Sequence, residues 1–418
     1  MSPPGPPGGE PRRARHAGAP AGVAAWRRIP RGIWALGLVS LCMDLSSELV
    51  HALLPLYLAT VLGASMLTIG LVEGIAEATA LVVKVFSGVL SDAVARRKPL
   101  VVLGYGLAAV TKLVFPLASS LGWIVGARFV DRIGKGIRGA PRDALIADLA
   151  PPALRGASFG LRQALDTVGA LGGPLLALAA MAWFAGSFTA AFWVAVVPAA
   201  IAVALLVLGV DEPARAAPPA AGKPRLAWRD VRRLPRDYWV IVGIAALLTL
   251  ARFSEAFLVL RAQDSELGVA GAPWVMVVMS AVYAAVAFPA GTALDRGHGA
   301  RLLSLGLAAL IAADLVLAAA TAVPWVMAGA ALWGLHMGLT QGLLAALVAA
   351  HAPADLRGSA FGVFNLAGGL ALLVASVVAG GVWDAFGARW TFVAGAVFTA
   401  LAWVALVLHG TQALRRTH

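Results

Sequence analysis

Long hydrophobic runs alternate with short polar segments from residue 31 to about residue 410. A bilayer core about 30 Å thick is crossed by roughly 20 apolar residues in a helix, and the runs reach that length. A β-barrel would instead show short segments of alternating polarity. The pattern predicts twelve transmembrane helices: Ile33–Leu62, Leu67–Leu90, Leu100–Ala118, Leu121–Ala147, Gly156–Phe184, Phe188–Val210, Tyr238–Leu260, Ala272–Leu294, Ala300–Ala320, Trp325–Val348, Ala360–Val382 and Trp390–Leu408.

The predicted helices fall into two groups of six, because a long polar segment follows the sixth run. The segment beginning at Leu154 matches the one at Leu356, and the segment at Gly88 matches the one at Gly291, with nearly the same offset. These matches predict a parallel duplication. We expect a disordered tail at 1–30, an N-terminal bundle at 31–210, a linker at 211–237, a C-terminal bundle at 238–410 and a second tail at 411–418.

Composition supports an all-α membrane protein. The chain is 60% hydrophobic and only 13% charged, whereas soluble domains carry roughly 25% charged residues. The net charge of +12 would suggest nucleic acid in a soluble protein, but it is typical of arginine-rich cytoplasmic loops in a membrane protein. The single cysteine, Cys42, excludes an internal disulfide and a multi-cysteine metal site. We expect no cofactor, no metal and no nucleic-acid partner.

Lysine and arginine in the loops predict the orientation of the helices, since cytoplasmic loops are enriched in both. Basic residues gather in the tails and in the loops on the same side of the membrane, while the opposite loops carry few. Arg261 and Arg389 are the exceptions on that opposite side. We therefore expect a multi-pass protein of the inner (plasma) membrane with both termini in the cytoplasm.

Ionisable side chains lie inside several predicted helices, where they are costly and mark substrate or ion paths. Asp44 is about eleven residues, or roughly 16 Å, from the start of its helix, which places it near mid-bilayer. Glu48 lies one turn further along the same face, and Glu77 is about as deep in the second helix. A carboxylate there is costly to ionise unless it is paired. These three are candidate proton carriers; the alternative is a static ion pair with a neighbouring arginine.

Other polar residues at membrane depth are candidates for a substrate cavity: His51, Glu73, Lys112, Arg162, Asp166, Arg252, Glu255, His336, Gln341 and Asn365. For His336, a structural hydrogen bond across helices is the favoured alternative. Acidic and basic candidates are nearly balanced. A cationic or amphipathic drug and an organic anion, phosphate ester or metal chelate therefore all remain open as substrates.

The basic segment from Arg128 to Arg142 lies in the fourth predicted helix. A phosphate-binding P-loop is excluded, because Lys135 precedes Gly136 within an apolar helix rather than following a glycine-rich turn. Nucleic-acid binding is excluded because the segment is membrane-embedded. Arg128 and Arg132 are deep enough to need acidic partners. The residues nearer the cytoplasm, Arg138, Arg142 and Arg155, are expected at the interface.

Two motifs resemble signatures of the major facilitator superfamily. The pattern Gly88-x-x-x-Asp92 with Arg96 and Arg97 is similar to the loop between the second and third helices of that family, although Ala93 replaces its first basic residue. A second copy is formed by Gly291, Asp295 and Arg296. The pattern Gly169-x-x-x-Gly173-Pro174 resembles the glycine–proline motif of proton-coupled drug antiporters in the superfamily.

The resemblance implies roles for these residues. Conformational gating falls to the residues of the three motifs, Gly88, Asp92, Arg96, Arg97, Gly169, Gly173, Pro174, Gly291, Asp295 and Arg296. The helix-four arginine of the family, Arg132 or Arg128 here, couples to an acid on helix one. It would therefore pair with Asp44 or Glu48 until a proton releases it.

The expected function is proton-coupled efflux of a small molecule by a monomer that works through alternating access. The main alternative is a proton symporter that takes up an organic anion or a metal chelate. A non-transporting sensor on the same fold is a further alternative. A membrane-embedded enzyme is disfavoured because residues 211–237 carry no catalytic cluster. We therefore expect a transporter rather than an enzyme.

Overall fold

The computed structural model describes residues 28–93, 96–212, 232–351 and 356–407. The predicted tails, except for residues 28–30, and most of the predicted linker lie outside these ranges. The described chain is helical and contains no strand. Its helices are α2 (Arg31–Thr60), α3 (Met66–Ala93), α4 (Lys98–Leu117), α5 (Leu121–Leu149), α6 (Arg155–Trp183), α7 (Phe188–Gly209), α9 (Arg236–Ala251), α10 (Ala256–Gln263), α11 (Gly268–Gly271), α12 (Trp274–Asp295), α13 (Gly299–Ala319), α14 (Val323–His351), α15 (Arg357–Phe386) and α16 (Ala388–Ala405), with a short 3-10 turn at Pro152–Leu154.

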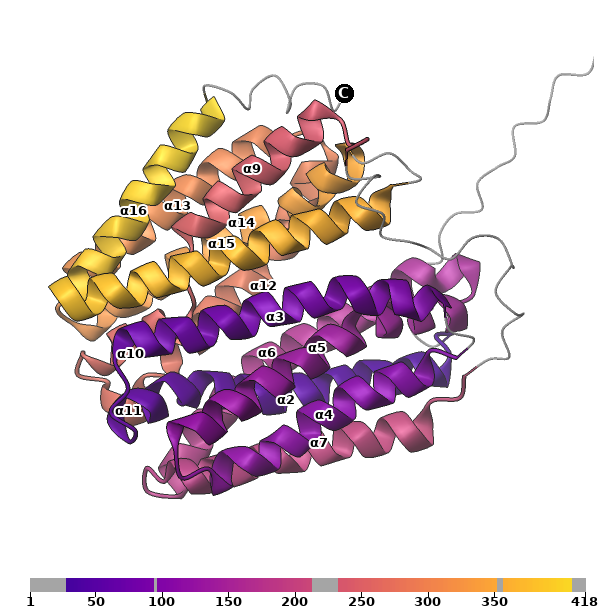
Figure 1. Cartoon of the computed structure of the whole chain (residues 1–418), viewed down its shortest axis with the longest axis horizontal. Helices are drawn as coiled ribbons and strands as arrows, with labels where there is room; N and C mark the ends of the chain where they lie inside the picture. The colour runs from indigo at the N-terminus through magenta and orange to yellow at the C-terminus, as the bar shows by residue number, and fades with distance from the viewer. Residues whose placement is uncertain (1–27, 94–95, 213–231, 352–355, 408–418) are drawn as a thin grey trace, which may run out of the picture.

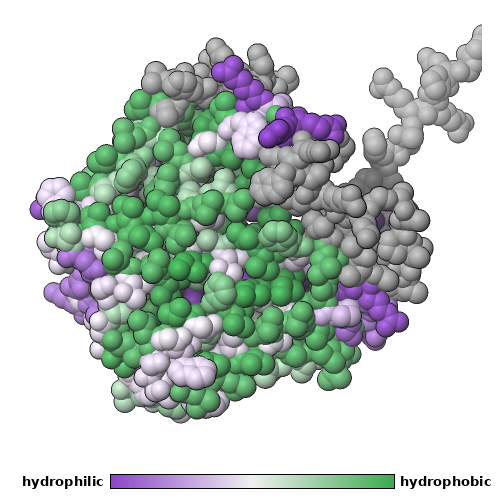
Figure 2. Space-filling model, viewed as in Figure 1, coloured by the Kyte–Doolittle hydropathy of each residue, from purple (hydrophilic) through white to green (hydrophobic). Residues whose placement is uncertain are grey.

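The predicted fold class is confirmed: twelve membrane-crossing units form two bundles (Figure 1). Helices α2–α7 form the lower bundle in the figure, and α9 and α12–α16 form the upper one, while the short helices α10 and α11 lie at the left beside the lower bundle. Within the described residues, nine spans are long and apolar enough to cross a membrane, and α16 is a shorter apolar helix. Figure 2 shows a broad hydrophobic surface with hydrophilic patches toward its edges, as a lipid-facing protein requires.

The seventh predicted helix differs from expectation, because it is broken. The sequence predicts one helix over Tyr238–Leu260, but α9 ends at Ala251 and α10 begins at Ala256. Residues 252–255 lie outside both helices, so their backbone N–H groups need partners other than the helical carbonyls. The amide of Ser254 finds one, since it donates to Ser376 Oγ at 3.2 Å. A broken helix at membrane depth is tolerated where it lines a cavity, and the polar residues of this break do so, as described below.

Glycines bury the arginine-bearing helix α5 between α3 and α4. A Cβ at Gly104 would lie 2.7 Å from the carbonyl oxygen of Gly134, and one at Gly136 would lie 2.9 Å from that of Ala80. Neither contact leaves room for a side chain. The backbones therefore approach closely, and the side chains of Arg128 and Arg132 are each only 1% exposed.

The glycine pair of α6 seats this helix on α2. A Cβ at Gly169 would lie 2.8 Å from the carbonyl oxygen of Leu41 and 2.9 Å from Asp44 Cβ. One turn later, a Cβ at Gly173 would lie 2.9 Å from the Leu49 nitrogen. Small residues four apart allow such close helix approach. The motif thus fixes the part of α2 that carries the candidate proton carriers.

Helices α3 and α15 join the two bundles where α3 begins and α15 ends. A Cβ at Gly70 would overlap the carbonyl oxygen of Ser376. The Asp384 carboxylate accepts hydrogen bonds from the amides of Met66 at 2.9 Å and Leu67 at 2.8 Å, and so satisfies free N–H groups at the start of α3. Figure 1 shows the two helices side by side at this end and diverging toward the other. These contacts close the two bundles against each other at this end.

This closure predicts the effect of one added methyl group. In Gly380→Ala the new Cβ would overlap the carbonyl oxygen of Met66 and lie 2.8 Å from Leu67 Cα, so the helices must separate. Overpacking of this kind costs about 1–3 kcal/mol. We expect a lower midpoint of thermal unfolding in detergent. The matched control is Gly381→Ala, whose Cβ meets its nearest neighbour at 3.8 Å; equal stability of the two variants would contradict the close contact.

Candidate functional site

A polar cavity of about 220 Å³ lies between the two bundles. The N-terminal bundle contributes side chains from α2, α3 and α5, and the C-terminal bundle contributes the α9–α10 break and parts of α14 and α15. The lining residues are Glu48, His51, Glu77, Lys135, Arg252, Phe253, Ser254, Glu255, Gln341 and Leu372. Charged groups from both bundles therefore face one space.

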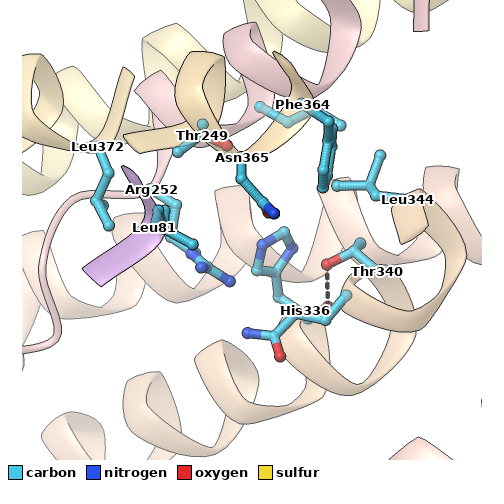
Figure 3. Close-up of a pocket in the computed structure, with 12 residues that line it drawn as sticks. Leu81, Thr249, Arg252, His336, Thr340, Leu344, Phe364, Asn365 and Leu372 are labelled. Atoms are coloured by element: carbon cyan, nitrogen blue, oxygen red, sulfur yellow. Dashed lines mark hydrogen bonds between the residues drawn. The ribbon is translucent and has the colours of Figure 1, made fainter. Parts of the chain in front are cut away.

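A second cavity of about 180 Å³ adjoins the first and belongs mainly to the C-terminal bundle (Figure 3). Arg252, Gln341 and Leu372 line both cavities, so the two are contiguous. The walls of the second cavity are largely apolar, with a few polar groups: Leu81, Leu248, Leu344, Phe364 and Leu372 beside Thr249, Thr340, His336 and Asn365. In Figure 3, Arg252, His336 and Asn365 point into the same space.

His336 is held in place by its neighbours. Its Nδ1 lies 2.8 Å from the carbonyl oxygen of Gly306 on α13, and the imidazole N–H donates to that oxygen. The structural hydrogen bond across helices that the sequence favoured is therefore present. The same ring borders the second cavity, so the bond fixes which face of the imidazole is presented there.

The wall beside the polar cavity contains buried ion pairs that cross three helices. Lys112 Nζ on α4 lies 2.8 Å from Asp131 Oδ1 on α5. Asp131 Oδ2 lies 3.7 Å from Arg132 Nε, and Arg132 Nη1 lies 3.1 Å from Glu77 Oε1 on α3. A second pair joins Arg128 Nη2 to Glu73 Oε2 at 2.7 Å. Positive and negative charges balance in this wall, as burial in a membrane requires.

The partners of the α5 arginines differ from those expected. Arg132 pairs with Glu77 and Arg128 with Glu73, both on α3, rather than with Asp44 or Glu48 on α2. The reason is packing: α5 runs along α3 and α4 and touches α2 only briefly. Asp44 instead lies 4.0 Å from Arg138, and Glu48 forms no ion pair within the described chain.

Two arginines expected at the membrane interface are covered by neighbouring helices: Arg138 is buried, and the Arg142 side chain is 13% exposed. The Arg138 side chain is 6% exposed, and its guanidinium lies 4.7 Å from the centre of the Tyr105 ring. Arg142 Nη1 donates to Ser40 Oγ at 2.9 Å. Helices α2 and α4 cover this face of α5, which continues to Leu149. The position of both arginines at the membrane interface stays a prediction. Arg155, at the start of α6, is exposed as expected.

The cavity candidates divide into two sets. His51, Arg252, Glu255, His336, Gln341 and Asn365 line the two cavities. Glu73 and Lys112 lie instead in the wall pairs. Arg162 and Asp166 pair with each other at 2.7 Å, and Arg162 also lies 3.7 Å from Asp143.

Sequence analysis missed Lys135 as a cavity residue and Asp131 as the link between Lys112 and Arg132. The spacing 128, 132 and 135 places Lys135 on the same helix face as the two buried arginines, and this signal was available.

Some predicted gating residues can be placed. The Arg97 guanidinium lies 2.7 Å from Asp148 at the end of α5, and the Arg97 amide donates to the Glu212 carboxylate. Arg96 and Arg296 are exposed. The side chains of Asp92 and Asp295 lie outside the described part of the structure. The first motif therefore contacts the end of α5 and the residues that follow α7.

One cluster invites a metal-site interpretation, since His51, Glu73 and Glu77 each offer a ligand atom within 4.8 Å of the others. Arg128 Nη2 lies 3.1 Å from His51 Nδ1. Because a guanidinium can only donate, Nδ1 accepts, and the proton of the neutral ring is on Nε2. That nitrogen then has no lone pair for a metal, and both carboxylates already face arginines. The cluster suits hydrogen bonding and ion pairing better than metal binding.

Comparisons with known proteins agree with this architecture. A family model described as Major Facilitator Superfamily matches residues 36–375 and also 254–416. An uncharacterised MFS-type transporter of Methanocaldococcus jannaschii is 31% identical over 390 residues, which cover 91% of this chain and 95% of that protein. The inner membrane transport protein YajR of Escherichia coli is 26% identical over 385 residues, covering 89% and 81%.

A solved structure shows the same fold at lower identity. The crystal structure of the nucleoside transporter NupG matches with a TM-score of 0.74 at 14% identity, covering 90% of this chain and 99% of that one. Together with the helical bundles and the cavity between them, these matches identify a transporter rather than an enzyme. The chain belongs to the major facilitator superfamily and is an integral membrane protein.

Proposed function

We propose that this protein is a monomeric, proton-coupled transporter that exports a small molecule across the inner (plasma) membrane by alternating access. This proposal rests mainly on the position of Glu77. It lines the polar cavity and pairs with Arg132, so one carboxylate belongs both to the cavity and to the buried wall. A proton that arrives through the cavity reaches Glu77 before any other acid of the wall network.

Protonation of Glu77 would unbalance the wall. The Glu77 side chain is 25% exposed, whereas Arg132 is 1% exposed. With Glu77 neutral, Arg132 keeps only Asp131, at 3.7 Å. An arginine without full compensation is costly in a membrane interior. Any conformation that gives Arg132 another partner or water is then favoured, which is how a proton shifts a two-state equilibrium.

Asp44 and Glu48 are proposed as further acceptors on the proton path. Asp44 is 26% exposed and loosely paired with Arg138 at 4.0 Å. Glu48 lines the cavity and has no ion pair among the described residues. Export by antiport needs a carboxylate that binds either a proton or the substrate. An unpaired acid in the cavity meets that need.

The conformation fits one stage of this cycle. If the termini are cytoplasmic, as the loop charges predict, the α3–α15 closure lies on the outer side and the protein faces inward. Gly169, Gly173 and Pro174 seat α6 against the acids of α2 and resemble the antiporter motif, which favours export. Uptake of an organic anion or metal chelate by symport is the second candidate, supported by Arg252 and Lys135 in the cavity.

Export can be tested in two steps. A bacterial strain that overproduces the protein is screened for protection against cationic drugs, organic anions and metal chelates. Each protective compound is then added to acid-loaded everted vesicles, where an antiporter releases protons. Proton release supports the proposal. Accumulation of the compound by intact cells would support symport instead, and substrate movement without any proton movement would contradict proton coupling.

We expect Glu77→Gln to abolish substrate-driven proton release from everted vesicles, because the amide cannot take up the proton. Substrate binding to the purified protein should persist. The matched control is Glu266→Gln, which changes an exposed acid between α10 and α11 that does not line either cavity. Unchanged proton release by the Glu77→Gln variant would contradict the role assigned to Glu77.

The wall pair of Arg128 and Glu73 should behave as a structural unit. Arg128→Met leaves the Glu73 carboxylate buried without its partner, and breaking such a pair costs about 3–5 kcal/mol. Adding Glu73→Met should recover most of that loss, because two apolar side chains need no compensation. Unfolding in detergent measures both effects. A double variant no more stable than Arg128→Met would show that the pair is not the source of the loss.

A further inference from the structure

We propose that the transported molecule is a zwitterion with a compact hydrophobic body. This inference rests on the transport function proposed above and names the substrate class for the same cavity. It assigns the cationic group of the substrate to Glu48 and Glu255, the anionic group to Arg252 and Lys135, and the hydrophobic body to the adjoining apolar cavity.

The first step is the contrast between paired and unpaired charges. Glu77 lines the polar cavity but is already neutralised by Arg132. The other four charged lining residues, Glu48, Lys135, Arg252 and Glu255, form no ion pair with any described residue. The N-terminal bundle pairs the charges of its wall across α3, α4 and α5. In the C-terminal bundle, the buried Asp314 has no partner among the described residues, but it lines neither cavity. The four unpaired groups of the polar cavity are thus the ones that a bound molecule can reach.

The second step is the balance of sign. Two acids and two bases are unpaired, so the cavity is neutral but strongly polar. A cation would neutralise the acids and leave the bases without partners, and an anion would do the reverse. Uncompensated charge in a site surrounded by bilayer is costly. A molecule that carries both charges leaves neither sign unpaired.

The third step is the order of groups along the cavity. Glu48 comes from α2 of the N-terminal bundle, while Arg252 and Glu255 come from the break between α9 and α10. Arg252 borders both cavities, so an anionic group bound there lies at their junction (Figure 3). The apolar cavity begins beyond it. A zwitterion bound to both bundles would also draw them together, as alternating access requires.

The apolar cavity limits the size of the hydrophobic body. Its volume is about 180 Å³, and its walls include Leu81, Leu344 and Phe364. Asn365 and Thr340 add hydrogen-bonding groups at its edge. Such a space fits a branched alkyl group or a single aromatic ring. It does not suit the several fused rings of a large amphipathic drug.

Two matched sets of probes test the charge requirement directly. The aromatic set is phenylalanine, phenethylamine and 3-phenylpropanoate, which carry both charges, the cation alone and the anion alone on similar bodies. The aliphatic set is leucine, 3-methylbutylamine and 4-methylpentanoate. Each compound is titrated against the purified full-length protein at neutral pH, and the dissociation constant is taken from the concentration dependence of thermal stabilisation.

We expect one or both zwitterions to bind roughly tenfold or more tightly than their singly charged counterparts, a difference of one decade in the dissociation constant. Glu255→Gln should weaken the zwitterion and favour the anion, whereas Arg252→Gln should weaken the zwitterion and favour the cation. Controls are Glu266→Gln and Arg301→Gln, which change exposed residues outside both cavities. Because the variants are judged by ratios of affinities, a change in folding yield does not mimic the result.

Tighter binding of a cation or an anion than of both zwitterions would overturn the proposal, and so would failure of all six probes to bind. Neither result would contradict proton-coupled export. That proposal is tested separately, by proton release with the compounds found in the growth screen. Conversely, zwitterion binding without proton release would leave the substrate class standing and remove the proposed coupling.

Discussion

The cost of burying arginine in a membrane is the constraint on which this structure depends. Arg128 and Arg132 lie on a helix enclosed by two others and are almost fully hidden. Each needs an acid at ion-pair distance, and Glu73 and Glu77 supply them from α3. The glycines of α4 and α5 follow from the same need, because only close backbones bring these side chains together. The glycines, the close helix packing and the ion pairs therefore all contribute to the same electrically neutral wall.

The charged groups of the polar cavity differ from those of the neutral wall, because most of them have no partner. In this wall every acid has a base beside it, whereas the unpaired groups of the polar cavity are available to a ligand or a proton. The break between α9 and α10 serves this purpose, since it turns Arg252 and Glu255 toward the space between the bundles. Glu77 belongs to both environments, since it lines the cavity and pairs with Arg132; in the mechanism that we propose, it transmits a change of charge in the cavity to the helix packing of the N-terminal bundle.

The number of helices, the duplication and the family could be read from the sequence because apolar runs and repeated motifs are local signals. The ion-pair partner of a buried residue is not a local signal, because it lies on another helix. Glu73 and Glu77 share the four-residue spacing of Arg128 and Arg132, which could have suggested a ladder between two helices, but no pattern says which helices are neighbours. The break after Ala251 was missed because hydrophobic runs flank it on both sides and no proline or glycine lies within residues 252–255. The burial of Arg138 was missed because α4 covers it. Five of the cavity candidates line the two cavities, where polar residues at membrane depth find a polar space, and their contact with a substrate stays a prediction: Arg252, Glu255, His336, Gln341 and Asn365.

The central claim is that Glu77 is the acid whose protonation disturbs the buried wall. Infrared difference spectroscopy of the purified protein on acidification measures this most directly, since each newly protonated carboxyl adds a C=O band. The account predicts a band in the wild-type spectrum that disappears in Glu77→Gln and persists in Glu266→Gln. An acidification spectrum that is the same in wild type and Glu77→Gln would contradict it.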